Sequence, residues 1–330
     1  MSASGMFRYL FARDGHPRRG PLPLEWVLYG YMAFTLLLLL FTCTEAVNPQ
    51  SMFLGRMRIL AMTLALWGVY RLLPCRFTML ARHVLQLLLL GWWYPDTYEF
   101  NRMFSNLDHL FAQAEQSLFG FQPALAFSEA FSSPFFSELM DLGYVSYYPM
   151  IAVITFFYFV YRYAEFERAC FIVFVSFFIS YVVFIFLPVV GPQFYYQAIG
   201  LDQVREGVFP AVGHYFFDHQ ESLPAVGWTD GVFYKLFLVA EDAGERPTAA
   251  FPSSHVSVSL VMLILAFRFH RRLGLVLLPF WLLLCFATVY VRAHYAIDAL
   301  AGILFGVLQY AVCAFVFDRF CGPKPKRQGR

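Results

Sequence analysis

Eight long apolar segments run along this chain, and they constrain its fold more than any other feature. A helix that spans a bilayer needs about 20 predominantly apolar residues. Charged residues make up only 14% of the chain, against roughly 25% in soluble domains. We therefore expect an all-α polytopic membrane helical bundle with about eight transmembrane helices. The expected segments are 24–43, 52–73, 79–95, 143–162, 168–190, 255–270, 273–291 and 297–318.

The distribution of Lys and Arg indicates how these segments cross the membrane. Cytoplasmic loops carry an excess of basic residues. With eight crossings and a cytoplasmic N-terminus, 17 of the 24 basic residues fall on the inner side of the membrane. The count predicts that both termini are cytoplasmic. It also predicts that loops 96–142 and 191–252 lie on the extracytoplasmic face, periplasmic or lumenal.

The chain divides into three parts by its sequence pattern. Residues 1–75 hold an N-terminal cytoplasmic segment and two extra transmembrane helices, in which we find no chemistry. Residues 76–320 form a six-helix core with the two outer loops, and residues 321–330 form a basic cytoplasmic tail. The six cysteines show neither a disulfide framework nor metal-ligand spacing, so we expect no metal and no other cofactor.

The two outer loops are predicted to carry short helices. Apolar residues at helical spacing in 98–118 indicate an amphipathic helix on the membrane surface, serving either as a lid or as a substrate contact. A second short helix is expected to start near Pro134, and an interfacial helix is expected within 230–241. A structureless loop as long as 191–252 is uncommon, so this loop should have a function or its own fold.

Two stretches at the outer ends of apolar segments, 250–255 and 288–298, carry titratable groups, which makes them functional candidates. His294 and Asp298 are four residues apart. On one helix face the carboxylate would fix the imidazole tautomer and leave the other nitrogen as a nucleophile. His255 begins a different helix on the same side and could protonate a departing oxygen, then activate an acceptor. These groups are suited to phosphoryl transfer through a phosphohistidine.

Candidate phosphate-binding groups flank the two histidines. Ser253 and Ser254 stand at the start of a predicted helix, where hydroxyls and free backbone amides can face a phosphate. Arg292 could stabilise charge on the phosphoryl oxygens in the transition state. Arg246 is a further basic candidate in the loop that leads to this helix. Lys235 fits an exposed charge on a loop helix better.

Each of these residues also has a plain structural interpretation. A lone histidine at a membrane interface is usually an amphipathic anchor, and Asp298 could pair with Arg292 to cap a helix. Their joint occurrence at the outer segment ends favours an active site. The alternative of another class is a catalytically silent membrane protein, either a lipid-binding scaffold or a transporter. A transporter typically has broken helices or polar residues in mid-membrane, and few are present.

The same residues resemble the motifs of the phosphatidic acid phosphatase type 2 superfamily of membrane phosphotransferases. Residues 252–255 match its Pro-Ser-Gly-His motif with Ser254 in place of glycine, and residues 294–298 match the His-x3-Asp half of its second motif. The resemblance implies a six-helix core over about 79–318 with an active site at its outer mouth. It further implies lipid substrates in the membrane and no nucleic-acid partner.

Two departures from those motifs resemble the inositol phosphorylceramide synthase branch. The arginine expected six residues before the nucleophilic histidine is Thr288, and the Lys-x6-Arg-Pro motif is absent from 187–193. Residues 288–298 match that branch's Thr-x-Tyr-x3-His-Tyr-x2-Asp pattern. The resemblance implies transfer of a phospho-headgroup, with inositol phosphate suggested, to a lipid hydroxyl such as that of ceramide in sphingolipid metabolism. The alternative is a lipid phosphate phosphatase acting on phosphatidic acid or a polyprenyl phosphate.

Overall fold

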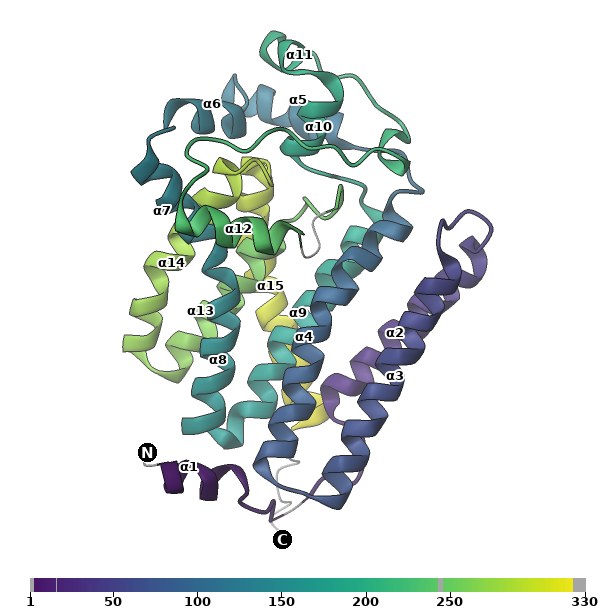
Figure 1. Cartoon of the computed structure of the whole chain (residues 1–330), viewed down its shortest axis with the longest axis vertical. Helices are drawn as coiled ribbons and strands as arrows, with labels where there is room; N and C mark the ends of the chain where they lie inside the picture. Colours follow the sequence, from purple (N-terminus) through teal and green to yellow (C-terminus); the bar gives the residue numbers. More distant parts are fainter. Residues whose placement is uncertain (1–2, 16, 243–245, 323–330) are drawn as a thin grey trace, which may run out of the picture.

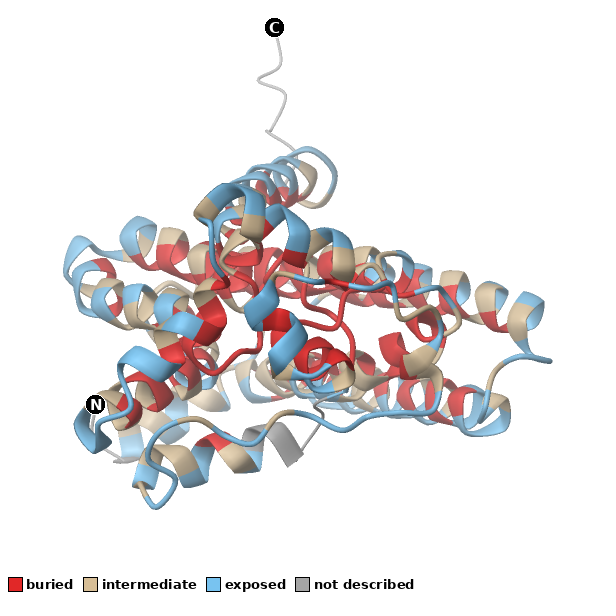
Figure 2. Cartoon of the chain, turned by 90° about the horizontal axis from the view of Figure 1, so that it is seen from above, coloured by how far each residue is buried: buried red, intermediate tan, exposed pale blue. Residues whose placement is uncertain are grey.

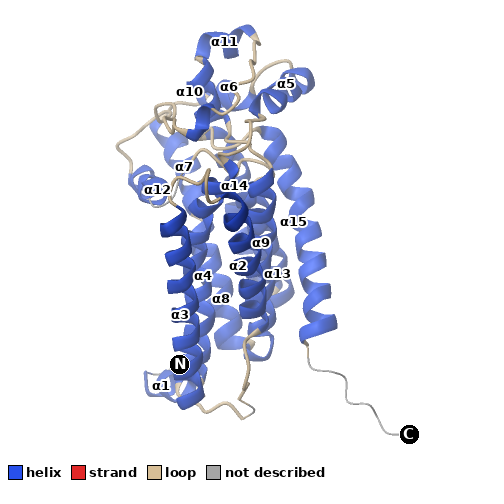
Figure 3. Cartoon of the chain, turned by 90° about the vertical axis from the view of Figure 1, so that its right-hand side faces the viewer, coloured by secondary structure: helices blue, strands red, loops and turns tan. Residues whose placement is uncertain are grey.

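The computed structural model describes residues 3–15, 17–242 and 246–322. Helices account for 75% of the structure, and no strand forms in the part that is described (Figure 3). The basic tail after Cys321 lies outside these residues except for Gly322. The expected all-helical class is therefore confirmed.

Eight long or moderately long helices form an elongated bundle (Figure 1), and each predicted apolar segment overlaps one of them. Five are long and apolar enough to cross a membrane, and a sixth span results if α7 and α8, which meet at a 42° bend, count as one. The predicted number of eight is not confirmed, because α13 has only 16 residues and α4 is not among the helices apolar enough to cross a membrane. The bundle helices are α2 (Pro23–Thr42), α3 (Pro49–Leu72), α4 (Arg76–Asn101), α8 (Tyr147–Tyr161), α9 (Tyr163–Phe186), α13 (Ser254–Phe269), α14 (Arg271–Tyr290) and α15 (Ala296–Val316).

Short helices cap one end of the bundle (Figure 1). The predicted starts near Pro134 and within 230–241 are confirmed by α7 and α12. The surface helix expected over 98–118 begins instead at Asp108, because α4 continues to Asn101. The capping elements are α5 (Asp108–Phe119), α6 (Pro123–Ala130), α7 (Pro134–Val145), α10 (Pro192–Ile199), α11 (Leu201–Glu206), the 3-10 turn η1 (Tyr215–Phe217) and α12 (Val232–Asp242). The helix α1 (Ala3–Leu10) and the π-helical turn η2 (Phe317–Cys321) lie at the opposite end (Figures 1 and 3).

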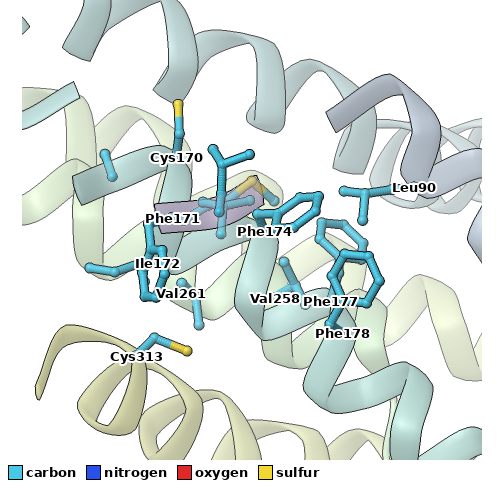
Figure 4. Packing of buried hydrophobic residues seen from close by; sticks show 14 of the residues in the cluster. Leu90, Cys170, Phe171, Ile172, Phe174, Phe177, Phe178, Val258, Val261 and Cys313 are labelled. Atoms are coloured by element: carbon cyan, nitrogen blue, oxygen red, sulfur yellow. The ribbon is translucent and has the colours of Figure 1, made fainter. Parts of the chain in front are cut away.

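Helix α9 is the centre of the bundle. It packs against α2, α4, α8, α13 and α15, and its share of buried residues exceeds that of the other candidate spans. Phe174, Phe177 and Phe178 interleave with residues of α4 and α13 (Figure 4). Viewed from above, buried residues face inward and exposed ones outward (Figure 2). Large apolar side chains such as Leu304 and Phe286 are exposed on the outer faces, as expected for contact with lipid.

Two buried ion pairs attach the N-terminal helices to α4. Arg56 of α3 contacts Asp96 at 2.6 Å, and Arg82 of α4 contacts Glu25 of α2 at 2.5 Å. Arg56 lies within the predicted segment 52–73; it is buried inside α3 and also donates to Thr35 of α2. Removing one partner of such a pair typically costs about 3–5 kcal/mol. These arginines therefore fix the extra helices against the core.

Close contact between α13 and α15 depends on two glycines of α15. A Cβ atom at Gly302 would lie 2.9 Å from the Ser253 carbonyl oxygen, and one at Gly306 would lie 2.6 Å from the Ser257 carbonyl oxygen. Small residues four apart allow membrane helices to approach this closely. The start of α15 is thereby held against the start of α13, where both sequence motifs lie.

Candidate active site

The structure brings the two predicted motifs together at the end of the bundle that carries the short helices. His255 begins the first turn of α13, and His294 lies in the turn between α14 and α15. The centroids of the two imidazole rings are 5.7 Å apart. A phosphorus atom between them would be within reach of both rings.

His294 is oriented by a backbone carbonyl. Its Nδ1 lies 2.7 Å from the Ala250 carbonyl oxygen, so Nδ1–H donates and the lone pair is on Nε2. Burial lowers the pKa of His294 to about 4, which keeps the ring neutral at pH 7. The imidazole thus has the tautomer and the charge that a nucleophile requires.

Asp298 does not bond to His294 in the predicted manner. Its Oδ2 lies 3.7 Å from His294 Nδ1 and accepts the backbone N–H of Tyr295 at 2.8 Å instead. The i,i+4 prediction was wrong in this detail because His294 precedes α15 and is not part of it. Asp298 caps the start of α15, and its carboxyl group lies beside the imidazole without a hydrogen bond to it.

Two carboxyl groups of α5, those of Glu115 and Asp108, support this turn, and no local motif marks either of them. Glu115 Oε1 accepts the backbone N–H of Ile297 at 3.1 Å, beside the Asp298 cap. Burial, with the nearby Asp298, raises the pKa of Glu115 to about 7. Glu115 and Asp298 each have one carboxyl oxygen without a hydrogen-bond partner among the described residues.

Asp108 connects three segments of the site. Its carboxyl oxygens accept the backbone N–H groups of Val190 at 2.7 Å and Gly191 at 2.9 Å, and the Tyr295 hydroxyl at 3.0 Å. Burial raises the pKa of Asp108 to about 6. This residue holds the segment after α9 against the turn that carries His294.

His255 lies between two aromatic rings. The rings of Tyr144 and Tyr147 each have centroids 4.7 Å from its own, and its Nδ1 has no hydrogen-bond partner among the described residues. Ser253 is the N-cap of α13 and accepts the Val256 N–H at 3.3 Å, which leaves its hydroxyl proton free to donate. Ser254 lines the larger cavity with His255.

Arg292 lies two residues before His294 in a strained backbone position. Its φ of 63° is in the left-handed region, and its carbonyl accepts the Gln193 N–H at 2.9 Å. Its Nε donates to Ser128 at 2.9 Å, while the side chain lines a polar cavity. Arg246 is exposed and lines neither cavity described below, so it is not placed with these residues. Lys235 is exposed, as predicted.

A large apolar cavity extends from His255 into the bundle. Its volume is about 580 Å³, within the range of ligand-binding pockets. Side chains of α4, α8 and α9, including Leu87, Tyr94 and Ile151, form its walls, and Ser254 and His255 lie at one end. The lining suits hydrocarbon chains.

A smaller cavity of about 290 Å³ lies beside the first. Six of its twelve lining residues carry polar side chains, and Gln193 and Phe237 line both cavities. An apolar and a polar compartment thus meet at Gln193 and Phe237, with His255 lining the apolar one. The lining residues with polar side chains are Asp141, Gln193, Ser222, Tyr234, Tyr290 and Arg292.

Within the described ranges, no group of three or more His, Cys, Asp or Glu side chains is placed to hold a metal ion. The chemistry available from the described residues is nucleophilic attack by His294, proton transfer by His255 and charge stabilisation by Arg292.

Comparison with known proteins gives one match. A family model described as the PAP2 superfamily matches residues 109–312, which is more than half of the chain and includes both histidines. No curated protein and no solved structure matches the chain.

Proposed function

This chain belongs to the PAP2 superfamily, whose membership suggests phosphatase or phosphotransferase activity on lipids, and on that premise we propose that it transfers a phospho-headgroup between lipids through a phosphohistidine at His294. His294 Nε2 attacks the phosphorus atom, and the bond to the lipid oxygen breaks. His255 acts as the general acid in this step, and its protonated form gives a proton to that oxygen. An acceptor hydroxyl then attacks the phosphorus, the N–P bond breaks, and His255 takes the hydroxyl proton.

The observation that carries this proposal is the position of His294. Its Nδ1 is tied to a carbonyl, its pKa is lowered, and its ring faces His255 at 5.7 Å. Arg292 is the cation that we assign to the phosphoryl oxygens, because it lines the polar cavity while Arg246 lines neither cavity. Ser254 is assigned to the phosphate through its place at the first turn of α13.

We assign a lipid hydroxyl as the acceptor, with ceramide and an inositol phosphate headgroup suggested by the resemblance of residues 288–298. The apolar cavity supports a lipid acceptor, because it can hold hydrocarbon chains beside His255. A phosphatase that uses water is the second candidate, since water can reach a phosphohistidine by the route that an acceptor takes. A catalytically silent lipid-binding protein would need no free Nε2 on His294.

We further propose that both termini are cytoplasmic and that the histidines work on the extracytoplasmic face. In this orientation 17 basic residues lie on the cytoplasmic side and 7 on the outer side, which supports it. Helix α1 and the end of α15 lie at the end of the bundle opposite the histidines, as an even number of crossings requires (Figure 1). In a Cys43→Ser background, a Gln220→Cys variant should react with an impermeant thiol reagent only from the extracytoplasmic side. Labelling from the cytoplasm would overturn the orientation.

Acceptor choice tests the function. Purified protein is incubated with a glycerophospholipid labelled in its phosphate, and water, ceramide and diacylglycerol are compared as acceptors. We expect label in the enzyme after acid-free quenching, and transfer to the lipid acceptor in preference to phosphate release. Rapid phosphate release that no lipid acceptor alters would favour the phosphatase. The absence of label in the protein would remove the phosphohistidine.

A further inference from the structure

The polar cavity contains an acidic side chain that the reaction described above does not use. Asp141 of α7 is 4% exposed and lines this cavity with Arg292. It makes no hydrogen bond and no ion pair with any residue in the described part of the chain. Burying a carboxyl group without a hydrogen-bond partner is unfavourable, and a ligand in the cavity would supply that partner.

The neighbours of Asp141 on α7 have structural partners. Ser137 contacts the Tyr290 hydroxyl at 2.9 Å and accepts the Trp228 N–H. Glu138 accepts three backbone N–H groups at the start of α12, over 232–234. These contacts hold α7 in place. The position of Asp141 therefore follows from that of the helix, without any hydrogen bond made by Asp141 among the described residues.

Asp141 lies one helical turn before a residue that contacts His255. Tyr144 is three residues further along α7 and lies on the same face. The Tyr144 ring is 4.7 Å from the His255 ring. Phe237, which lines both cavities, packs on Tyr144 with ring centroids 5.1 Å apart. The carboxyl group is thus about one helical turn from Tyr144, whose ring contacts that of His255.

The chemistry of the cavity matches a ligand with several hydroxyl groups. Asp141 offers acceptors and Arg292 offers donors, and a hydroxyl can both donate and accept. A cationic headgroup fits less well, because Arg292 places a positive charge in the same small cavity. Tyr290 is packed against Phe127 and Phe136, so its ring faces are not open as an aromatic cage requires.

We propose that this cavity binds a polyhydroxylated headgroup of the donor lipid and that Asp141 selects it by accepting hydrogen bonds from its hydroxyls. The proposal rests on the proposed function for its account of why a headgroup stands there. In this arrangement Arg292 faces the phosphate, Asp141 faces the far side of the headgroup, and the lipid chains occupy the apolar cavity. Asp141 is a specificity-determining residue and takes no part in bond breaking.

Binding of free headgroup phosphates to the full chain in detergent tests this without turnover. The probes are inorganic phosphate, phosphocholine, glycerol 1-phosphate and myo-inositol 1-phosphate. We expect affinity to rise with the number of hydroxyls. Asp141→Asn should weaken binding of the two polyol phosphates by about tenfold or more, the loss typical of a hydrogen bond to a charged group. The affinity for inorganic phosphate should change less than threefold.

Asp202→Asn is the matched control, because Asp202 is exposed on α11 and pairs only with Arg205 in the described structure at 3.9 Å. It should leave all four affinities unchanged. Equal losses for inorganic phosphate and for the polyol phosphates in Asp141→Asn would overturn the proposal, as would tightest binding of phosphocholine. If Asp141→Asn fails to fold, Asp141→Glu keeps the charge one methylene further out and should weaken only the polyol phosphates.

The same binding series separates this inference from the proposed function. His294→Ala should form no phosphoenzyme while its affinity for myo-inositol 1-phosphate stays within a few-fold of wild type. If the wild-type protein forms no phosphoenzyme but binds polyol phosphates through Asp141, the transfer function fails and the binding site stands. If it forms a phosphoenzyme and Asp141→Asn binds every probe normally, the site fails and the function stands.

Discussion

The pH dependence of phosphoenzyme formation follows from the burial of His294. Its pKa is lowered to about 4, against 6.5 for an unperturbed imidazole. At pH 5 a group with pKa 4 is about nine-tenths neutral, whereas a group with pKa 6.5 is only about 3% neutral. The structure therefore predicts about 30-fold more reactive nucleophile at pH 5 than an exposed histidine would supply.

The assay is the rate of phosphoenzyme formation at low substrate concentration, measured by rapid quench from pH 4 to pH 8. Under these conditions the profile reports groups of the free enzyme. Titrating groups near His294 are His255 at 5.7 Å between ring centroids, Asp298 at 3.7 Å from Nδ1, and Glu115, whose pKa is raised to about 7. Glu115 titrates near pH 7, well above the region near pH 4 in which protonation of His294 should lower the rate, called the acid limb below.

Stability must be followed over the same range. The folded pKa of His294 lies below its unfolded value, so its neutral form is favoured by folding. The stability that this provides is present above pH 6.5 and is lost as pH falls toward 4, by roughly 3 kcal/mol at most. An acid limb near pH 6.5 in protein that is still folded would refute the argument that burial keeps His294 neutral.

Three further predictions concern single residues. His294→Ala should abolish phosphoenzyme formation. Asp298→Ala should lower the rate of phosphoenzyme formation by about 100-fold or less, because the Ala250 carbonyl still orients the imidazole. Equal losses in the two variants would show that the Asp298 carboxylate orients the imidazole. Arg292→Gly should lose activity yet keep or raise the melting temperature, since glycine relieves about 1–2 kcal/mol of left-handed backbone strain. Arg292→Lys should also have low activity, because lysine lacks the planar guanidinium group. Arg56→Met should destabilise the fold by about 3–5 kcal/mol, and adding Asp96→Leu should recover most of the loss; an additive loss would contradict the ion pair.

The helices were predictable from the sequence, whereas their number in the membrane was not. Runs of apolar residues locate α9, α14 and α15 directly, because nothing else competes with burial in lipid for such segments. Helix α4 differs, since Arg82 and Asp96 are neutralised by partners on α2 and α3. Those partners are 57 and 40 residues away along the chain, so no local pattern reveals them.

The site was predictable only where its chemistry lies in side chains of a local motif. His255 and His294 are recognisable in this way. The group that orients His294 is a backbone carbonyl, which every residue has and which no sequence pattern marks. Glu115 and Asp108 appear in the sequence as polar positions of an amphipathic helix. They are buried because the loop at 191–252 and the start of α15 cover that face of α5.

Glu115 gives the last prediction, on stability. Its folded pKa of about 7 lies above the unfolded value of 4.5, so folding favours its protonated form. That stability is fully present below pH 4.5 and is lost as pH rises through 7, by roughly 3 kcal/mol at most. Glu115→Gln keeps an acceptor for the Ile297 N–H and cannot ionise. The variant should melt close to wild type at pH 5 and above wild type at pH 8, whereas Asp202→Asn should match wild type at both. Asp108 titrates alike in both proteins, so the difference isolates Glu115. Equal destabilisation of Glu115→Gln at the two pH values would mean that its carboxyl group acts only through hydrogen bonds and not through its charge.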